Sequence, residues 1–188
     1  DIFAVNDPYL GGTHLMDVRF HMPFYYQGEL FAWLSNTGHW PDTGGMVPGG
    51  FSAFATEVEQ EGLRFPPVKL YKQGELDQEI LSIFLSNMRI ADQRIGDIKA
   101  QSAALFVGER RLTALLDKCG VDLTNAVIKE MRGRAAQQMR ARINTISNGV
   151  YQGISYVDSD GVVNEPLKID MKIRKEDGAR YFDLSGSS

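Results

Sequence analysis

The feature that most restricts how this chain can fold is a pair of apolar, aromatic segments separated by only two residues. Residues 18–26 and 29–35 are rich in side chains that favour strands, and Gln27-Gly28 joins them. Such a short connection with glycine at its second position predicts a β-hairpin. Because a hairpin brings its two ends together, Asp17 and His39 are expected to lie close to each other at its base.

All three histidines of the chain lie within or beside this hairpin. His14 lies three residues before Asp17, a spacing that lets both side chains converge from one tight turn, and His39 follows the second strand. Two neutral imidazoles and one carboxylate can bind a first-row divalent ion and leave positions open for water or substrate. We predict a metal site at His14, Asp17 and His39, although three unrelated histidines are also ordinary in a chain of this length. His21, inside the first strand, is interpreted as structural.

The segment after the hairpin is a loop rich in glycine and proline. Its large apolar side chains, Trp40, Met46 and Phe51, would serve no purpose in a flexible linker, so we expect the loop to face the substrate. Asp42 lies three residues beyond His39 and is either a fourth ligand or a catalytic group. In the catalytic role it would accept a hydrogen bond from a liganding imidazole or hold a water at the metal. Catalysis needs an open coordination position, which favours this second role.

Residues 56–62 carry three glutamates at alternate positions, Glu57, Glu59 and Glu61. The simplest interpretation is a short helix in contact with solvent. The functional alternative is that one carboxylate reaches the metal site as a general base, with Glu57 and Glu61 as the candidates. Pro66-Pro67 then excludes a helix interior, so the chain should return to extended structure.

After residue 74 the apolar period changes to that of a helix. Asp77 can cap a first helix that runs to about residue 88. A second helix should cover residues 91–118 and end before Gly120, and a third should run from about residue 122 to 146. The residues expected to face inward are Ile80, Leu81, Phe84 and Leu85 in the first helix. In the second they are Ile95, Ile98, Leu105, Leu112 and Leu116, and in the third Ile128, Met131, Ala135, Met139 and Ile143.

Three polar residues of the second helix follow each other at helical spacings. Arg94, Asp97 and Gln101 lie along one edge of the apolar stripe. A local ion pair between Arg94 and Asp97 would contribute only about 0.2–0.5 kcal/mol. The alternative is that this edge faces the metal loop and that all three residues bind substrate.

The last part of the chain returns to strands, so that the whole is expected to have an α+β fold. Antiparallel strands are predicted at residues 150–157, 167–174 and 179–184, with hairpin signals at Asp160-Gly161 and Asp177-Gly178. Residues 167–173 alternate between apolar and polar, which predicts one buried and one solvated face. The expected segments are a β and loop region with the metal site (1–73), a helical segment (74–148) and a β-meander (149–188).

Charge and composition exclude several classes of protein. The formal net charge is −4, from 20 basic and 24 acidic residues, so no basic excess points to a nucleic acid. No apolar run approaches the ~18 residues that a membrane span needs. The single cysteine, Cys119, excludes an internal disulfide framework and fits a reducing compartment. We therefore expect a soluble, cytoplasmic protein.

Four longer segments follow one another in an informative order. They are NDPYLGGTHLMD from Asn6, GHWPDTGGMVPGG from Gly38, ATEVEQEGLRFPPVKLY from Ala55 and NMRIADQRIGDIKAQ from Asn87. Together they resemble successive motifs of the hydantoinase B/oxoprolinase family, and the resemblance extends from residue 6 to about residue 187. That family includes the B components of N-methylhydantoinases, the C-terminal half of 5-oxoprolinases and alpha subunits of acetone carboxylases. Its members are much longer, so we expect this chain to be a partial catalytic domain.

The resemblance implies the same metal ligands as the spacing does. In the acetone carboxylase branch a His-x-x-Asp pair and a later histidine hold the metal, and these positions match His14, Asp17 and His39. Many relatives carry a second histidine where this chain has Trp40, so no role of that histidine is transferred. Manganese or zinc is the expected ion.

The resemblance also implies an activity. It indicates the catalytic subunit of an ATP-dependent hydrolase that opens hydantoin, 5-oxoproline or lactam rings. Because the chain has no Gly-x-x-x-x-Gly-Lys-Ser/Thr loop, ATP is expected on a hydantoinase A-type partner, in a hetero-oligomer. The alternative is the alpha subunit of an ATP-dependent ketone carboxylase. A non-haem iron oxygenase and a scaffolding subunit with a structural metal are further alternatives.

Overall fold

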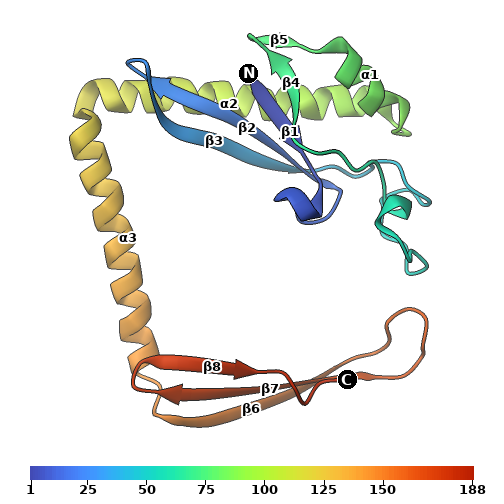
Figure 1. Cartoon of the computed structure of the whole chain (residues 1–188), viewed down its shortest axis with the longest axis vertical. Helices are drawn as coiled ribbons and strands as arrows, with labels where there is room; N and C mark the ends of the chain where they lie inside the picture. Colours follow the sequence, from blue (N-terminus) through green and yellow to red (C-terminus); the bar gives the residue numbers. More distant parts are fainter. The chain divides into compact units, whose positions relative to one another are not determined.

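The computed structural model describes all residues from 1 to 188 and divides the chain into two compact units, Asp1–Lys118 and Cys119–Ser188 (Figure 1). The boundary falls within the segment 74–148 that we expected to be helical. Two of its helices belong to the first unit and the third belongs to the second unit. The secondary structure is that of an α+β chain, as predicted. None of its helices combines the length and the apolar character that a membrane span needs.

The first unit contains a five-stranded sheet in which neighbouring strands are antiparallel, in the order β3-β2-β1-β4-β5 (Figure 1). The strands are β1 Ile2–Val5, β2 Asp17–Tyr26, β3 Glu29–His39, β4 Val68–Lys72 and β5 Glu75–Leu76. The predicted hairpin is confirmed, with both turn residues at positive φ, 52° at Gln27 and 88° at Gly28. Its second strand runs to His39, four residues beyond the expected end at residue 35.

The helices of the first unit are α1 Gln78–Ser86 and α2 Ala91–Cys119, close to the predicted ranges, and two short 3₁₀ turns are η1 Pro8–Leu10 and η2 Val58–Gln60. Asp77 caps α1 as expected, because its carboxylate accepts hydrogen bonds from the backbone N–H of Glu79 and of Ile80, both 3.0 Å long. The core forms where one face of the sheet meets these helices (Figure 1). It includes Val18, Phe20 and Met22 of β2, Leu81 and Phe84 of α1, and Ile98 and Leu105 of α2.

The second unit consists of α3 Val121–Asn144 and an antiparallel meander of β6 Gly149–Val157, β7 Leu167–Glu176 and β8 Ala179–Asp183. The three strands lie where the sequence predicts them. Asp177-Gly178 forms the tight turn before β8, with φ values of 43° and 84°. Asp160-Gly161 instead lies in a longer loop, where the Asp160 carboxylate accepts hydrogen bonds from the N–H groups of Val162 and Val163.

Two predictions about burial in the second unit are wrong. Of the five residues expected to face inward from α3, only Ile143 is buried, while Met131 is 65% exposed. In β7 the apolar side chains Ile169 and Met171 are exposed, whereas Asp170 is buried beneath its polar neighbours. Periodicity tells which side chains share a face, but burial requires a second layer, and no element of this unit covers these faces.

Candidate metal centre

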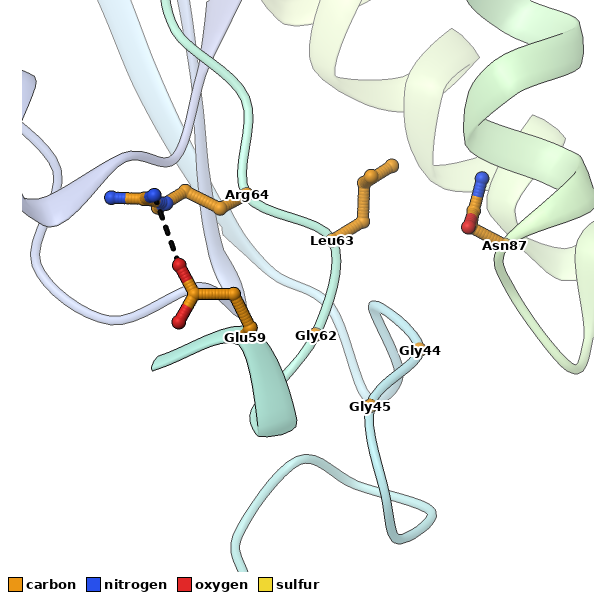
Figure 2. A pocket seen from close by; sticks show the side chains of 7 residues that line it. All are labelled: Gly44, Gly45, Glu59, Gly62, Leu63, Arg64 and Asn87. Carbon is orange, nitrogen blue, oxygen red and sulfur yellow. Dashed lines mark hydrogen bonds and ion pairs between the residues drawn. The ribbon is translucent and has the colours of Figure 1, made fainter. Parts of the chain in front are cut away.

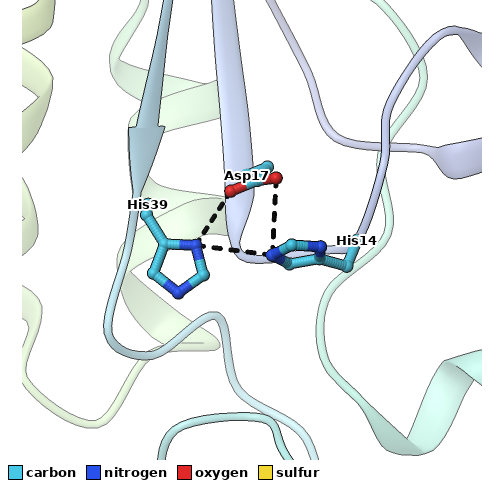
Figure 3. A group of neighbouring side chains, drawn as sticks. All are labelled: His14, Asp17 and His39. Carbon is cyan, nitrogen blue, oxygen red and sulfur yellow. Dashed lines mark hydrogen bonds and ion pairs between the residues drawn. The ribbon is translucent and has the colours of Figure 1, made fainter. Parts of the chain in front are cut away.

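The base of the β2–β3 hairpin carries two of the predicted ligands. Asp17 is the first residue of β2 and His39 the last of β3, and the two are Cα partners across the ladder. Directly paired residues project from the same face of a sheet. The side chains therefore meet, with 2.8 Å between His39 Nδ1 and Asp17 Oδ1 (Figure 3).

A bulge in β3 produces this pairing. Tyr25 pairs with Leu30, but Phe24 pairs with Ala32, so Phe31 is the extra residue. Without the bulge, Asp17 would face Gly38, and the His39 side chain would project from the opposite face. The bulge therefore brings the His39 imidazole to the Asp17 carboxylate. No feature of the local sequence predicted this bulge.

The third predicted ligand comes from the turn that leads into β2. The backbone N–H of Asp17 donates to the His14 carbonyl at 2.9 Å, which folds the two side chains toward each other. His14 Nε2 lies 3.4 Å from Asp17 Oδ2 and 3.4 Å from His39 Nδ1 (Figure 3). Glycine is required nearby, because a Cβ on Gly12 would lie 2.4 Å from the carbonyl oxygen of Asn6.

The distances between the three donor groups suit a small divalent ion. One donor atom from each of His14, Asp17 and His39 lies within 4.8 Å of the others. Ligands bound at about 2.1 Å in tetrahedral or octahedral geometry are about 3.0–3.4 Å apart, close to the separations found here. The side chains of His14 and His39 are 43% and 54% exposed, so one side of the group is open to solvent. These residues could hold a metal and still leave coordination positions free.

Thr13 orients the carboxylate. Its hydroxyl donates a 2.6 Å hydrogen bond to Asp17 Oδ2, which fixes the carboxyl plane relative to both imidazoles. This bond is the main reason why the pKa of the Asp17 carboxyl is lowered, followed by the hydrogen bond from His39, while partial burial acts in the opposite direction. Sequence reasoning missed Thr13, although its place four residues before Asp17 was visible.

His21 lies outside this group. It follows Asp17 by four residues along β2 and pairs with Phe3 and Ser35 in the sheet. Burial, and then the charge of Arg19, lowers the pKa of its imidazole. It does not join the cluster of donor atoms, in keeping with the structural role that we assigned to it.

Asp42 has other partners than we expected. Its side chain is only 8% exposed and accepts hydrogen bonds from the Gly44 N–H and from Arg89 Nη1, each 2.9 Å long. Arg89 also donates to the carbonyl oxygens of Gly44 and Gly45. The expected hydrogen bond from a histidine imidazole to Asp42 is not formed, because the carboxylate oxygens of Asp42 accept from Gly44 and Arg89 and so hold the loop to the segment before α2.

The predicted general bases lie in and beside η2. Neither Glu57 nor Glu61 belongs to the donor cluster of the hairpin base. Glu57 is exposed and precedes the turn without capping it, and the Glu61 N–H donates to the Val58 carbonyl. The third glutamate, Glu59, is paired at 3.0 Å with Arg64. The expected short helix is therefore a single 3₁₀ turn, and a catalytic role of these carboxylates stays a prediction.

Of the three polar residues predicted on one edge of α2, Gln101 contacts the hairpin, and substrate binding by Arg94 and Asp97 stays a prediction. Arg94 is buried and forms the expected ion pair with the half-exposed Asp97. Gln101 is bound within the protein: its Oε1 accepts from Trp40 Nε1 at 2.7 Å and its Nε2 donates to the Val18 carbonyl at 3.0 Å. Substrate binding by Gln101 would have to break these bonds, so the structure gives it a different task.

That task is to hold the two strand ends that carry Asp17 and His39. Val18 follows Asp17, and Trp40 follows His39. The Gln101 carboxamide also donates to Asn36 Oδ1 at 3.1 Å. A Cβ on Gly38 would lie 2.4 Å from Gln101 Oε1, so a larger residue there would displace the carboxamide. Trp40 is only 1% exposed and is therefore a core residue.

A separate cavity of about 370 Å³ lies beside the glycine-rich loop (Figure 2). It is lined by Gly44, Gly45, Glu59, Gly62, Leu63, Arg64 and Asn87. The charges of Arg64 and Glu59 are matched in their ion pair across its wall. None of the three donor residues of the hairpin base lines this cavity, so it is separate from the candidate metal centre.

The chain is similar to known proteins over its whole length. The family model described as hydantoinase B/oxoprolinase matches residues 1–188. The beta subunit of caprolactamase from Pseudomonas jessenii is 40% identical over 86% of the chain, which covers 28% of that protein. The B component of a putative D-/L-hydantoinase from Pseudomonas sp. (strain NS671) is 31% identical over 100% of the chain and 33% of the relative. The delta subunit of acetophenone carboxylase from Aromatoleum aromaticum is 28% identical over 98% of the chain and 27% of the relative.

The fold has a close counterpart among solved structures. The crystal structure of an ATP-dependent caprolactamase from Pseudomonas jessenii superposes with a TM-score of 0.88 at 36% identity, covering 97% of this chain and 31% of that one. The chain thus spans about a third of the length of the relatives that it matches.

Proposed function

Because the chain belongs to the hydantoinase B/oxoprolinase family, we propose that it forms the metal-binding part of the catalytic subunit of an ATP-dependent cyclic-amide hydrolase. The observation that carries this proposal is the convergence of His14, Asp17 and His39 at an open hairpin base. The names of a caprolactamase and a hydantoinase among the relatives support a cyclic amide as the substrate. We propose a hydantoin, 5-oxoproline or lactam ring.

Each residue of the centre has a defined task in this proposal. A bound divalent ion, with manganese or zinc as the expected ions, would polarise a substrate oxygen or make water a better nucleophile. His14 and His39 provide neutral nitrogen donors, and Asp17 provides one negative charge. Thr13 keeps the Asp17 carboxylate turned toward the imidazoles. The solvent-facing side leaves room for the ring.

The proton that leaves the attacking water needs an acceptor. We retain Glu57 and Glu61 as candidates for the general base, because their loop packs against the segment that follows His39. The Glu61 carbonyl lies close beneath Gly45 and Gly50 of that segment. Replacing each glutamate by Gln, with the exposed Glu29→Gln as a control, tests the assignment. Activity unchanged in both variants would exclude them.

ATP would bind elsewhere. Opening an unstrained amide ring is difficult, and the chain contains no phosphate-binding Gly-x-x-x-x-Gly-Lys-Ser/Thr sequence. We propose that ATP binds to a hydantoinase A-type partner and that the two proteins form a hetero-oligomer. Calorimetry with ATP on the chain alone should show no binding, and micromolar affinity would contradict this division.

A ketone carboxylase component is the second candidate. It is favoured by the 28% identity to one subunit of an acetophenone carboxylase over nearly the whole chain. In that reaction the same open centre would hold a ketone-derived carbon nucleophile next to activated bicarbonate. Both candidates need the three donor residues, so the substrate decides between them.

One experiment tests the site and the reaction together. The chain and its ATP-binding partner are purified, and the metal content is measured with ADP release and ring opening or carboxylation. Alanine at His14, Asp17 or His39 should remove the metal and abolish the activity, whereas His21→Ala should retain both. Full metal occupancy in any of the first three variants would remove that residue from the ligand set. Carboxylation of a ketone without ring opening would favour the second candidate.

A further inference from the structure

We propose that Phe51 forms an apolar wall of the substrate site, so that the centre prefers cyclic amides with several methylene groups. This inference rests on the proposed function and specifies its substrate class. The Phe51 ring lies 6.3 Å from the His39 ring, nearly parallel at 24°, and 5.9 Å from the His14 ring. The Phe51 ring therefore lies beside both imidazoles, stacked with that of His39 and tilted by 53° to that of His14.

The backbone fixes this position of Phe51. Gly50 has a φ of 69°, and a Cβ there would lie 2.9 Å from the Met16 sulfur and 3.1 Å from the Glu61 carbonyl oxygen. The chain thus passes tightly over the segment that leads into Asp17, at a point where only glycine fits. Phe51 is the next residue, so its ring is directed at the imidazoles by a restrained backbone.

Most of the Phe51 ring is nevertheless open. The residue is 72% exposed, although a benzene ring gains most when it is fully buried. Stacking on His39 covers part of the ring and leaves much of its surface for another molecule. A ligand held at the open side of the three donor groups would lie next to this surface, and its hydrocarbon part would displace water from the ring.

The hydrocarbon part of the ring separates the three candidate substrates. Hydantoin offers only one methylene group to Phe51. 5-Oxoproline has two methylene groups and a charged carboxylate, which gains nothing from contact with an apolar surface. A lactam such as ε-caprolactam has an uncharged ring with five methylene groups, so it can cover the most of the exposed Phe51 ring.

The test measures ligand binding and does not depend on turnover. The full chain is loaded with Mn²⁺, and the paramagnetic relaxation of ligand protons is followed by NMR for ε-caprolactam, hydantoin and 5-oxoproline. Phe51→Ala should raise the Kd of ε-caprolactam about tenfold, or about 1.4 kcal/mol, and change the other two less than about twofold. Phe51→Leu should retain most of the affinity. The matched control is Phe54→Ala, which removes a 77% exposed phenylalanine from the same loop.

The outcomes separate the inference from the function on which it rests. Loss of affinity for ε-caprolactam alone, with unchanged Mn²⁺ content, supports the apolar wall. An equal loss for all three ligands, or no loss for ε-caprolactam, overturns the inference and leaves the proposed function standing. If none of the three ligands is relaxed by Mn²⁺ in the unchanged protein, the cyclic-amide function itself fails.

Discussion

Replacing Gln101 by Met tests whether α2 holds the two strand ends of the candidate metal centre. Methionine is also unbranched and of similar length, so the variant removes the carboxamide with little change in shape. It leaves the Trp40 N–H and the Val18 carbonyl without their partner on α2, and both residues are at most 1% exposed, so water cannot replace the lost bonds. Asn36 is only half-buried, and its amide can turn to water.

The magnitude follows from these two groups. A buried donor or acceptor left without a partner costs about 1–3 kcal/mol, so Gln101→Met should lower the free energy of unfolding by about 3 kcal/mol. Urea unfolding followed by tryptophan fluorescence measures this, because both tryptophans, Trp33 and Trp40, belong to the first unit. Metal affinity should fall as well, since the released strand ends carry Asp17 and His39.

A matched control makes the result decisive. Gln93→Met introduces the same change at an exposed position of the same helix and should alter stability by less than about 0.5 kcal/mol. If Gln101→Met is no more destabilising than Gln93→Met, the hydrogen bonds to Trp40 and Val18 do not hold the strand ends together. A large loss of stability with full metal affinity would show that α2 supports the fold but not the centre.

Three further predictions concern the neighbours of the centre. Thr13→Val should weaken metal binding about 10–100-fold in a metal titration, whereas Thr13→Ser should restore it. In the metal-free chain, ¹³C NMR should place the Asp17 midpoint below 3.8. Ionised Asp17 therefore stabilises the fold at pH values above its unfolded pKa of about 3.9, and this stabilisation is lost as the pH falls through the lower pKa of the folded state. A midpoint above 3.8 would refute this prediction. Asp42→Asn should retain the metal in elemental analysis but lower the melting temperature, because Arg89 loses a buried carboxylate; metal loss would make Asp42 a ligand.

Local sequence determined the elements and the chemical character of the site. Gln27-Gly28 between two strand-forming segments left a hairpin as the simplest solution, because glycine tolerates the positive φ of a two-residue turn. Asp77 and the apolar period of residues 78–118 defined two helices in the same way. The types of side chain at positions 14, 17 and 39 predicted a site for a divalent ion before any distance was known, and the structure brings the three donor groups together.

Tertiary structure decided the register and the partners. The bulge at Phe31 sets whether His39 faces Asp17 or the opposite side of the sheet, and a shift of one residue leaves the local composition unchanged. Gln101 reaches Val18 over 83 positions and Arg89 reaches Asp42 over 47, so no spacing rule could assign these contacts.

Burial also depended on the tertiary structure and not on the sequence of a single element. The apolar stripe of α3 and the alternation of β7 are both present in the sequence, yet Met131 and Met171 are exposed. A periodic pattern fixes which side chains share a face because it follows from the geometry of one element. Whether that face is covered depends on a second element, and only the three-dimensional arrangement of the chain provides one.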